Sequence, residues 1–387
     1  MNRPRVAYLS SDPGIPPDSS KGASVHFREL AAAFARIGVD LDVFLAREGD
    51  VSGFLPHQAR TVPTPRGAGV EGEVLQIAHA SALLAALRAS GPHVAVYERL
   101  SLFGLAGTVY ARSLGIPHLV EVNAPLWREA AAFRGLVLHD SARGICLDVV
   151  RSADRVLAVS HALADELADA GVRRDRLEVL GNGADLSRFR RATAAPKPAC
   201  LRGRPTLLFL GSLKPWHGLP FLLEGFRALR ATRDCGLWIV GDGPGRDLAL
   251  AAARQHPQDI VVHGAVPHEE VPGILKAADV VVAPYTADSP LYFSPLKIVE
   301  AVAAGRPVLA SRVPCVVETL GGGDLPGLFR TDDVRDFVAA AQRTMTDGVL
   351  APDALVAQLD WEQKAARIAG WMGVECASGS LLEAAHV

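Results

Sequence analysis

The sequence predicts an α/β protein of two domains, each built on a doubly wound parallel sheet. Three observations predict this class. The chain has 387 residues, which is enough for two domains rather than one core. A strand–loop–helix pattern opens the chain, and the same pattern restarts after residue 205. Residues 188–205, between the two halves, are charged, contain proline and show no periodicity, which is typical of a linker.

In the first half, residues 5–10 are predicted as a strand, and a turn-rich loop leads to a helix over 23–37 with apolar residues at helical spacing. Gly38 ends this helix, and 39–45 is the second strand. Strand, glycine-containing loop, helix and strand in this order open a doubly wound parallel sheet. The other predicted elements are strands at 93–99, 118–123 and 155–160, helices at 78–89, 102–114 and 161–170, and a short strand and turn at 177–185.

Polar residues end two of these strands. Glu98 and Arg99 follow one apolar run, and Glu121 and Asn123 belong to the end of the next. Ligands of open parallel sheets lie outside the carboxyl ends of the strands, so these side chains are pocket candidates by topology. The alternative is that they cap strand ends or pair with each other.

The second half repeats the pattern. Its predicted strands are 206–212, 237–240, 260–264 and 280–285, and its predicted helices are 219–230, 246–255 and 269–277. The repetition implies two Rossmann-like domains facing a cleft, where ligands commonly lie. An amphipathic helix is predicted at 361–372, and residues 377–387 are expected to be loosely held.

Residues 294–311 predict one helix with both ends marked, followed by a short buried strand. Ser294 is expected to be the N-cap, and Pro295 suits the first helical position, where a missing N–H costs nothing. Gly305 can take the left-handed conformation that closes a helix, and Pro307 cannot continue one. Such a helix would be buried almost all round.

Lys297 and Glu300 interrupt the apolar character of this helix, three residues apart and therefore on one face. The N-terminus of a buried helix carries unpaired N–H groups and about half a positive charge, which makes it an anion site. Glu300 lies deeper, and an acceptor-only carboxylate there suits a diol, such as ribose beside a diphosphate. The alternative is a plain core helix with a Lys–Glu pair at the surface.

Composition and charge exclude several classes. The formal net charge is −2, so no basic field points to nucleic acid. The five cysteines are dispersed, with no CxxC and no histidine at metal spacing, which favours reduced thiols and predicts no metal site. Residues 1–10 lead into a strand rather than a signal peptide, and no apolar run approaches membrane-spanning length. We therefore expect a cytoplasmic protein without an integral membrane segment.

Several motifs occur in a characteristic order. In the second half they lie at 209–218 (FLGSLKPWHG), 240–244 (VGDGP), 263–266 (HGAV) and 294–311, and in the first half at 21–26, 97–103 and 121–125. In order and spacing they resemble the retaining glycosyltransferases of family 4, which have the GT-B fold. No single motif is decisive, but the ordered set is specific. The resemblance covers most of the chain, from Arg5 to Met372.

The resemblance implies the GT-B fold, with two Rossmann-like doubly wound parallel-sheet domains facing an interdomain cleft. The expected N-terminal, acceptor-side domain covers 1–190, and the nucleotide-sugar-binding domain covers 191–360. In 361–387, a helix would pack back towards the N-terminal domain before a loose tail. The implied activity is transfer of a hexose or N-acetylhexosamine from a nucleotide-diphosphate sugar, with UDP-sugar as the family default. The acceptor would be a hydroxyl of a small molecule, such as a natural product or an aminocyclitol, and no metal or other cofactor is expected.

Residue roles follow from the same resemblance. Glu300 would bind the ribose, the amides from Ser294 to Leu296 the diphosphate, and the main chain of Val266 the base. Donor contacts are assigned to Gly22, Ser212, His217, Gly241, Val266, Ser294, Pro295, Leu296, Lys297 and Glu300. Acceptor contacts are assigned to Lys21, Ala23, Glu98 and Asn123, and catalytic roles to Lys214, His26 and Glu121.

The sequence departs from the family pattern in two places. The first of two glutamates usual in the family, eight positions before Glu300, is replaced by Tyr292. The usual cationic pair is replaced by Ser212 and His217, so Lys214 or Lys297 would have to supply the charge. Two alternatives follow: a GT-B epimerase or phosphorylase, and a non-catalytic protein that binds a sugar or nucleotide.

The expected chemistry needs no protein nucleophile. A helix N-terminus with one or two cations neutralises the departing phosphate without metal. The acceptor hydroxyl attacks from the same face of the sugar, and its proton passes to that phosphate. The sequence shows no Ser-His-Asp or Cys-His set that would indicate a covalent intermediate.

Overall fold

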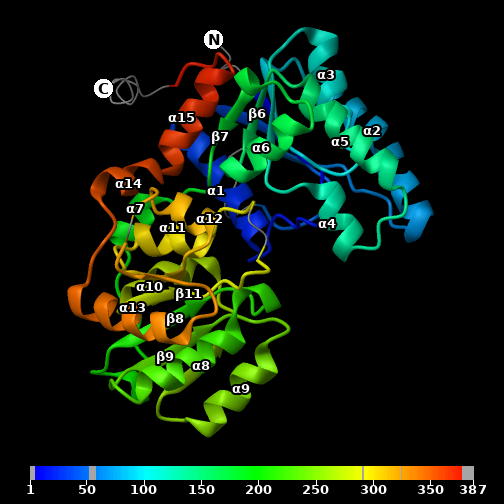
Figure 1. Ribbon diagram of the computed structural model, residues 1–387. Helices are drawn as coiled ribbons and strands as arrows, with labels where there is room; N and C mark the ends of the chain where they lie inside the picture. The colour runs from blue at the N-terminus through cyan, green and yellow to red at the C-terminus, as the bar shows by residue number, and fades with distance from the viewer. Residues whose placement is uncertain (1–4, 52–57, 290–291, 324, 377–387) are drawn as a thin grey trace. The chain divides into compact units, whose positions relative to one another are not determined.

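The computed structural model describes residues 5–51, 58–289, 292–323 and 325–376. It contains two compact units (Figure 1): unit 1 is Met1–Gly181 with Trp361–Val387, and unit 2 is Asn182–Asp360. The division therefore falls after Gly181 and not after residue 190. The reason is helix α7 (Leu186–Arg191), whose Leu186 and Phe189 are buried in the core of unit 2. Residues 377–387, which we expected to be loosely held, lie outside the described residues.

Unit 1 is built on a parallel sheet of seven strands in the order β3-β2-β1-β4-β5-β6-β7. The strands are β1 (Arg5–Ser10), β2 (Asp40–Leu45), β3 (Gln58–Thr61), β4 (Ala95–Arg99), β5 (His118–Val122), β6 (Arg155–Ala158) and β7 (Leu177–Val179). Strand order reverses between β1 and β4, and ligands of such sheets lie at this switch point. The sequence did not predict β3, because its residues are mostly polar and exposed or half-buried.

Helices cover both faces of the unit 1 sheet. α1 (Gly22–Arg36) and α15 (Trp361–Trp371) share a core with Tyr8 and Tyr97, whereas α2 (Gly69–Ser90) and α3 (Ala106–Leu114) share another with Val96. Tyr97 and Val96 are consecutive residues of β4, so the two cores lie on opposite faces of the sheet. The other helices of the unit are α4 (Leu126–Phe133), α5 (His139–Ser152) and α6 (His161–Asp169).

α2 is longer than the helix predicted at 78–89. It has 22 residues and is long and apolar enough, by length and composition, to cross a membrane, which corrects the expectation that no segment approaches that length. Leu83 and Leu87 pack into the core of unit 1. The Glu73 carboxylate accepts hydrogen bonds from the amides of Val137 (2.8 Å) and Leu138 (2.6 Å). Apolar and polar contacts therefore both tie α2 to unit 1.

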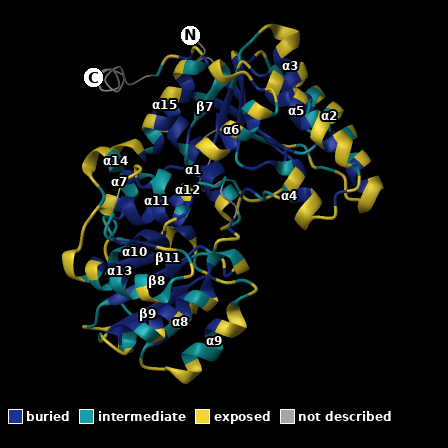
Figure 2. Cartoon of the chain, viewed as in Figure 1, coloured by how far each residue is buried: buried dark blue, intermediate teal, exposed yellow. Residues whose placement is uncertain are grey.

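Unit 2 is built on a parallel sheet of six strands in the order β10-β9-β8-β11-β12-β13. The strands are β8 (Thr206–Leu210), β9 (Gly236–Val240), β10 (Ile260–Gly264), β11 (Val280–Ala283), β12 (Val308–Ser311) and β13 (Leu328–Phe329). Its helices after α7 are α8 (Leu219–Arg230), α9 (Arg246–Gln255), α10 (Val271–Ala277), α11 (Leu296–Ala303), α12 (Pro314–Thr319), α13 (Val334–Asp347) and α14 (Asp353–Gln358). The central strands β8, β9 and β11 are buried throughout, whereas α8, α9 and α13 expose one side (Figure 2).

The predicted central helix exists, but its start differs from the prediction. α11 begins at Leu296, Pro295 occupies the N-cap position, and no side chain caps the helix. The Ser294 hydroxyl instead accepts a hydrogen bond from the amide of Asn182 at 3.0 Å, and the Ser294 carbonyl accepts one from Asn182 Nδ2 at 2.6 Å. Ser294 is therefore not an N-cap, because its hydroxyl already serves a segment more than a hundred residues away in the sequence.

The stretch at 188–205 is more ordered than a linker. α7 occupies its start, and the ammonium of Lys276 donates to the carbonyls of Arg190 (2.8 Å) and Ala192 (2.7 Å) at the end of that helix. Leu201, in a 3₁₀ turn, is fully buried in the core of unit 2. The charged composition of residues 188–205 suggested a linker, but the side chains of Lys276 and Leu201 attach this stretch to unit 2.

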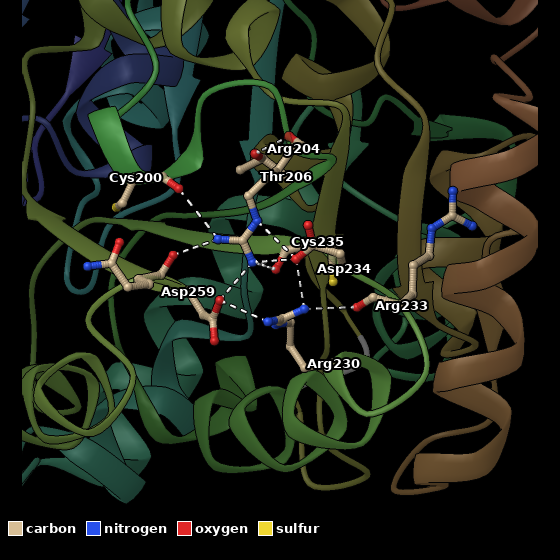
Figure 3. A network of polar contacts seen from close by, with 9 residues as sticks. Cys200, Arg204, Thr206, Arg230, Arg233, Asp234, Cys235 and Asp259 are labelled. Carbon is tan, nitrogen blue, oxygen red and sulfur yellow. Dashed lines mark hydrogen bonds and ion pairs between the residues drawn. The ribbon is translucent and has the colours of Figure 1, made fainter.

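Arg204 ends this stretch and joins the amino ends of neighbouring strands (Figure 3). Its guanidinium donates to the carboxylates of Asp234 (2.8 Å) and Asp259 (2.7 Å) and to the carbonyl of Cys235 (2.9 Å). Arg230 lies 2.9 and 3.1 Å from the same two carboxylates. Asp234 and Asp259 precede β9 and β10. The network therefore links the amino ends of these strands, on the side of the sheet opposite the carboxyl ends.

Candidate active site

The site in unit 2 is centred on the first turn of α11. The amides of Ile298 and Val299 donate to the carbonyl of Pro295 at 3.0 and 3.2 Å, and so belong to the helix ladder. The preceding amides, of Leu296 and Lys297, have no carbonyl further back in the helix to reach. They lie at the positive end of the helix dipole, which favours an anion.

Lys297 brings a buried amine to this helix start. Its side chain lies 4.3 Å from the ring centroid of Phe209 and 5.4 Å from that of Tyr285. Within the described residues, its Nζ atom is buried and has no hydrogen-bond partner. Burial lowers the pKa of Lys297 from 10.5 to about 7. The alternative of a surface Lys–Glu pair is therefore wrong, because both Lys297 and Glu300 are buried.

The loop after β8 lies against Lys297. A Cβ atom at Gly211 would sit 3.5 Å from Lys297 Cε, and Gly211 has φ +128°. Gly241, after β9, has φ +143°, and a Cβ atom there would meet the Gly211 carbonyl oxygen at 1.9 Å. The amide of Gly241 donates to the carbonyl of Gly264, at the end of β10, at 2.6 Å. The glycines therefore bring three strand ends together at the edge of the sheet where Lys297 lies.

His217 faces the same amine. Its Nδ1 atom bonds to the carbonyl of Ser212, so Nδ1 carries the hydrogen and Nε2 the lone pair. Burial, and then the charge of Lys297, lowers the pKa of His217 to about 3. Ser212 and Lys214 are exposed on this loop, and Lys214 Nζ lies 4.9 Å from the ring centroid of Trp216. The structure thus groups Lys297 with His217 and leaves Lys214 at the surface.

Glu300 points to a histidine that the sequence did not single out. His268 Nε2 lies 2.7 Å from Glu300 Oε1, and both side chains are buried. His268 precedes α10 and follows Val266, which is partly buried against the core of unit 2. Tyr292, in place of the family's first glutamate, is half-buried before α11. The segment that contains Val266, expected to contact the base, is therefore linked through His268 to Glu300, expected to bind the ribose.

In unit 1, a second polar cluster surrounds Glu121 at the end of β5. Arg99 Nη1 donates to Glu121 Oε1 at 2.9 Å, and His26 Nε2 lies 2.9 Å from the same oxygen. The Tyr97 hydroxyl and the Asn123 amide also donate to this carboxylate. Together these residues surround one carboxylate with hydrogen-bond donors.

This environment determines the ionisation of Glu121. Burial opposes ionisation, but the charge and hydrogen bond of His26, with Arg99 and Tyr97, outweigh burial and hold the pKa of Glu121 well below its usual range. A carboxylate that stays ionised and is already bonded to several donors is a poor proton acceptor. The geometry therefore argues against the catalytic role predicted for Glu121 and gives it a positioning role for His26 and Asn123.

Glu98 lies on the opposite face of the unit 1 sheet from this cluster. Its Oε2 atom lies 3.0 Å from His118 Nε2, and a Cβ atom at Gly107 of α3 would meet the same oxygen at 2.0 Å. The side chain is 1% exposed. The contacts of Glu98 with His118 and α3 therefore argue against the acceptor role predicted for it. Adjacent residues of a strand face opposite ways, so Glu98 and Arg99 cannot share one site.

The loop before α1 presents the remaining predicted residues of unit 1. Lys21 occupies the N-cap position and is exposed, and Gly22 and Ala23 form the first turn of the helix. Arg28 Nη1 braces this loop by donating to the carbonyls of Pro17 (2.8 Å) and Ser19 (2.7 Å). Within the described residues of both units, no group of three or more His, Cys, Asp or Glu side chains could hold a metal ion.

Comparison with known proteins decides the family. Residues 20–188 match the model described as Glycosyltransferase Family 4, and residues 204–347 match the model described as Glycosyl transferases group 1. The chain belongs to the family 4 glycosyltransferases. This family 4 glycosyltransferase therefore moves a sugar from a nucleotide sugar.

Two curated relatives illustrate the range of this similarity. The D-inositol 3-phosphate glycosyltransferase of Acidothermus cellulolyticus is 27% identical over 368 residues, which cover 85% of this glycosyltransferase and 79% of the relative. The 2-deoxystreptamine glucosyltransferase of Streptomyces kanamyceticus is 27% identical over 293 residues, which cover 72% of each chain.

Solved structures of similar shape show the fold of this glycosyltransferase. Sucrose-phosphate synthase from Thermosynechococcus elongatus superposes with a TM-score of 0.69 at 19% identity, covering 95% of this chain and 98% of that one. HepE of Anabaena, in complex with UDP and glucose, superposes with a TM-score of 0.69 at 16% identity, covering 96% and 100%. With two parallel-sheet units, the fold is GT-B, as the sequence predicted.

Sequence reasoning missed two residues of this glycosyltransferase that hold its predicted site residues. Asn182 binds Ser294 from a distant segment, and His268 binds Glu300 across 32 positions. Neither has a local sequence signal, because each acts through a contact that only the folded sheet creates.

Proposed function

We propose that this glycosyltransferase binds the diphosphate of a nucleotide sugar at the start of α11 and transfers the sugar with retention of its anomeric configuration. The observation that carries the proposal is the buried amine of Lys297, which has no hydrogen-bond partner within the described residues. A buried polar group without a partner costs free energy, and a buried cation costs more. A diphosphate bound at the helix start would give this amine its missing partner.

The nucleoside would lie beside α11. Glu300 Oε1 is bonded to His268, so we assign the diol of the ribose to Oε2. The main chain at Val266 would contact the base, and Gly241 would let the donor approach the strand ends closely. Uracil is our choice of base. The likeness in fold to HepE, whose structure contains UDP, supports this choice.

The reaction would proceed on the donor phosphate without a protein nucleophile. As the anomeric bond breaks, negative charge grows on the departing phosphate, and the amides of Leu296 and Lys297, with the Lys297 amine, would stabilise it. Lys214 is the second cation we assign to this role. The acceptor hydroxyl attacks from the same face and passes its proton to the departing phosphate. We propose that no metal is required, so excess EDTA should leave the rate unchanged.

We assign the acceptor to unit 1 and propose a small polyhydroxylated molecule, such as an aminocyclitol. The similarity to the 2-deoxystreptamine glucosyltransferase supports this class. His26 and Asn123 both contact Glu121, which fixes their orientation, and Lys21 and Ala23 lie at the start of α1. His26 and Asn123 would therefore contact hydroxyl groups from a rigid position.

Calorimetry with UDP tests the donor assignment. Glu300→Ala should weaken UDP binding by roughly 10- to 150-fold, the loss expected for a hydrogen bond to a charged group. Glu269→Ala, at an exposed position before α10, should bind as the wild type does. Unchanged affinity in Glu300→Ala would refute the assignment. A thermal-shift screen with UDP-, GDP- and TDP-sugars would identify the donor, because a ligand that binds only the folded state raises its melting temperature.

The anomeric configuration of the product, read by NMR, tests retention. Turnover of the donor without an acceptor would instead favour an epimerase or phosphorylase. Binding with neither transfer nor hydrolysis, across a panel of aminocyclitols and sugars, would favour a non-catalytic protein.

A further inference from the structure

Among the residues that the structure describes, no acidic side chain bonds to the amine of Lys297. The ring carbons of Phe209 and Tyr285 face it from β8 and the end of β11. The acid next along α11, Glu300, is bonded to His268. Within the described residues, the Nζ atom has no hydrogen-bond partner. The aromatic rings therefore enclose the amine of Lys297, but no bonded anion from the described part of the chain neutralises a positive charge on it.

The other titratable groups around Lys297 do not provide that compensation. His217 faces it from the 3₁₀ turn before α8, and its Nε2 atom carries no proton because Nδ1 donates to the Ser212 carbonyl. The exposed amine of Lys214 approaches His217 from the same loop. From α12, the thiol of Cys315 interacts with Tyr285, and burial raises the pKa of both groups, so neither supplies a negative charge at neutral pH. Lys214 adds a positive charge to this side of the site, and the carboxylate of Glu318, on α12, acts on the Cys315 thiol.

Resting on the proposed function, we propose that binding of the donor diphosphate is coupled to uptake of a proton from solvent by Lys297. In the empty enzyme near pH 8 the amine is mostly neutral, because burial lowers its pKa to about 7. A diphosphate beside Nζ supplies the missing negative charge and raises that pKa. The added proton comes from water, and no bond to carbon is made or broken in this step.

The sign of the pH dependence follows from this coupling. Because the bound state holds the proton more tightly than the free state, donor affinity is highest at and below the pKa of the free amine, about 7. Above that value, affinity falls by up to about tenfold per pH unit until the pKa of the bound amine is reached. His217, whose pKa is lowered to about 3, would add a second proton only at lower pH. The interval from pH 7.5 to 8.5 therefore isolates Lys297.

Calorimetric titration at pH 8 in two buffers of different ionisation enthalpy measures the proton directly. The probe is whichever of UDP-glucose, GDP-mannose and TDP-glucose raises the melting temperature most. A sugar nucleotide is preferable to a free nucleoside diphosphate, because the terminal phosphate of the latter itself takes up protons, with a pKa of about 6. We expect the wild type to take up close to one proton per donor bound.

Three variants complete the experiment. Lys297→Arg carries a permanent charge, so any binding it retains should take up no proton. Lys214→Met, at an exposed amine on the neighbouring loop, should keep the wild-type proton uptake even if its affinity falls. Lys297→Met should melt above the wild type in the absence of donor, because an apolar side chain then replaces an uncompensated amine. A melting temperature at or below that of the wild type would contradict the burial on which the inference depends.

Two failures remain distinguishable. Binding of a sugar nucleotide with no proton uptake in the wild type, or equal uptake in Lys297→Arg, overturns this inference and leaves the proposed function standing. Failure of all three sugar nucleotides to bind overturns the proposed function and this inference with it.

Discussion

Replacement of His268 would test how the nucleoside is recognised. His268 Nε2 lies 2.7 Å from Glu300 Oε1, and this contact holds the carboxylate in one orientation inside unit 2. In His268→Ala the carboxylate loses that donor and can turn away from the position assigned to the ribose. His268→Gln keeps a side-chain amide that can donate to the same oxygen. The two variants therefore separate loss of the contact from loss of the imidazole.

The size of the effect follows from the contact that Glu300 would make. A hydrogen bond to a charged group contributes about 1.5–3 kcal/mol. Since about 1.4 kcal/mol corresponds to a factor of ten, complete loss of the ribose contact weakens nucleotide binding by roughly 10- to 150-fold. We expect His268→Ala to approach this loss and His268→Gln to recover part of it.

The assay compares UDP with 2′-deoxy-UDP by calorimetry. The wild type should prefer UDP, because the deoxy analogue leaves Glu300 with one donor fewer. In His268→Ala the preference should shrink towards equal affinity, an effect that general destabilisation of the fold would not produce. Glu269→Ala, at an exposed neighbouring position, should keep the wild-type preference. If His268→Ala discriminates between the two nucleotides as the wild type does, His268 does not position Glu300 for the ribose.

Three further predictions concern the framework around the sites. Arg204→Lys loses the two-carboxylate contact at the amino ends of β9 and β10, which should cost about 2 kcal/mol and lower the melting temperature of unit 2 by about 4–8 °C. Its affinity for UDP should stay unchanged, since the site lies at the carboxyl ends, and Arg233→Lys serves as a control. Gly241→Ala places a methyl group 1.9 Å from a carbonyl oxygen at φ +143°, so both the melting temperature and donor binding should fall. Glu121→Gln tests, by urea unfolding at pH 7 and pH 4, how the ionisation of Glu121 is linked to folding of unit 1. Because folding lowers the pKa of Glu121, its contribution to stability is present above the unfolded value of about 4.3 and is lost as pH falls. The free energy of unfolding should therefore fall more on acidification in the wild type than in the variant. A variant that weakens as much as the wild type would contradict the assigned ionisation.

The sequence predicted the fold well because the repeated pattern of strand, loop and helix is a local signal. It also predicted the central helix, since apolar runs, proline and glycine mark its ends. The start of α11 was displaced by one residue because Ser294 serves Asn182, a contact that depends on folding of the whole unit. No local pattern contains that information.

The two glutamates of unit 1 illustrate a different limit. Both follow apolar runs, and both were predicted to lie at one site. In the sheet, Arg99 pairs with Glu121, whereas Glu98 pairs with Val120 and faces α3. The register between two parallel strands decides which side chains meet, and that register is not written in either strand alone.

The order of the units along the chain affects how the protein is made. Unit 2 is one continuous segment, whereas unit 1 is completed by the last residues of the chain, where Trp361 and Ile368 join the core that covers Tyr8 and Tyr97. During synthesis on the ribosome, the apolar side of α1 therefore stays exposed until all of unit 2 and then α15, which packs on it, have been made. A truncated product that ends before Trp361 would expose that surface and be prone to aggregate or be degraded, whereas a fragment spanning Asn182–Asp360 contains every residue of unit 2.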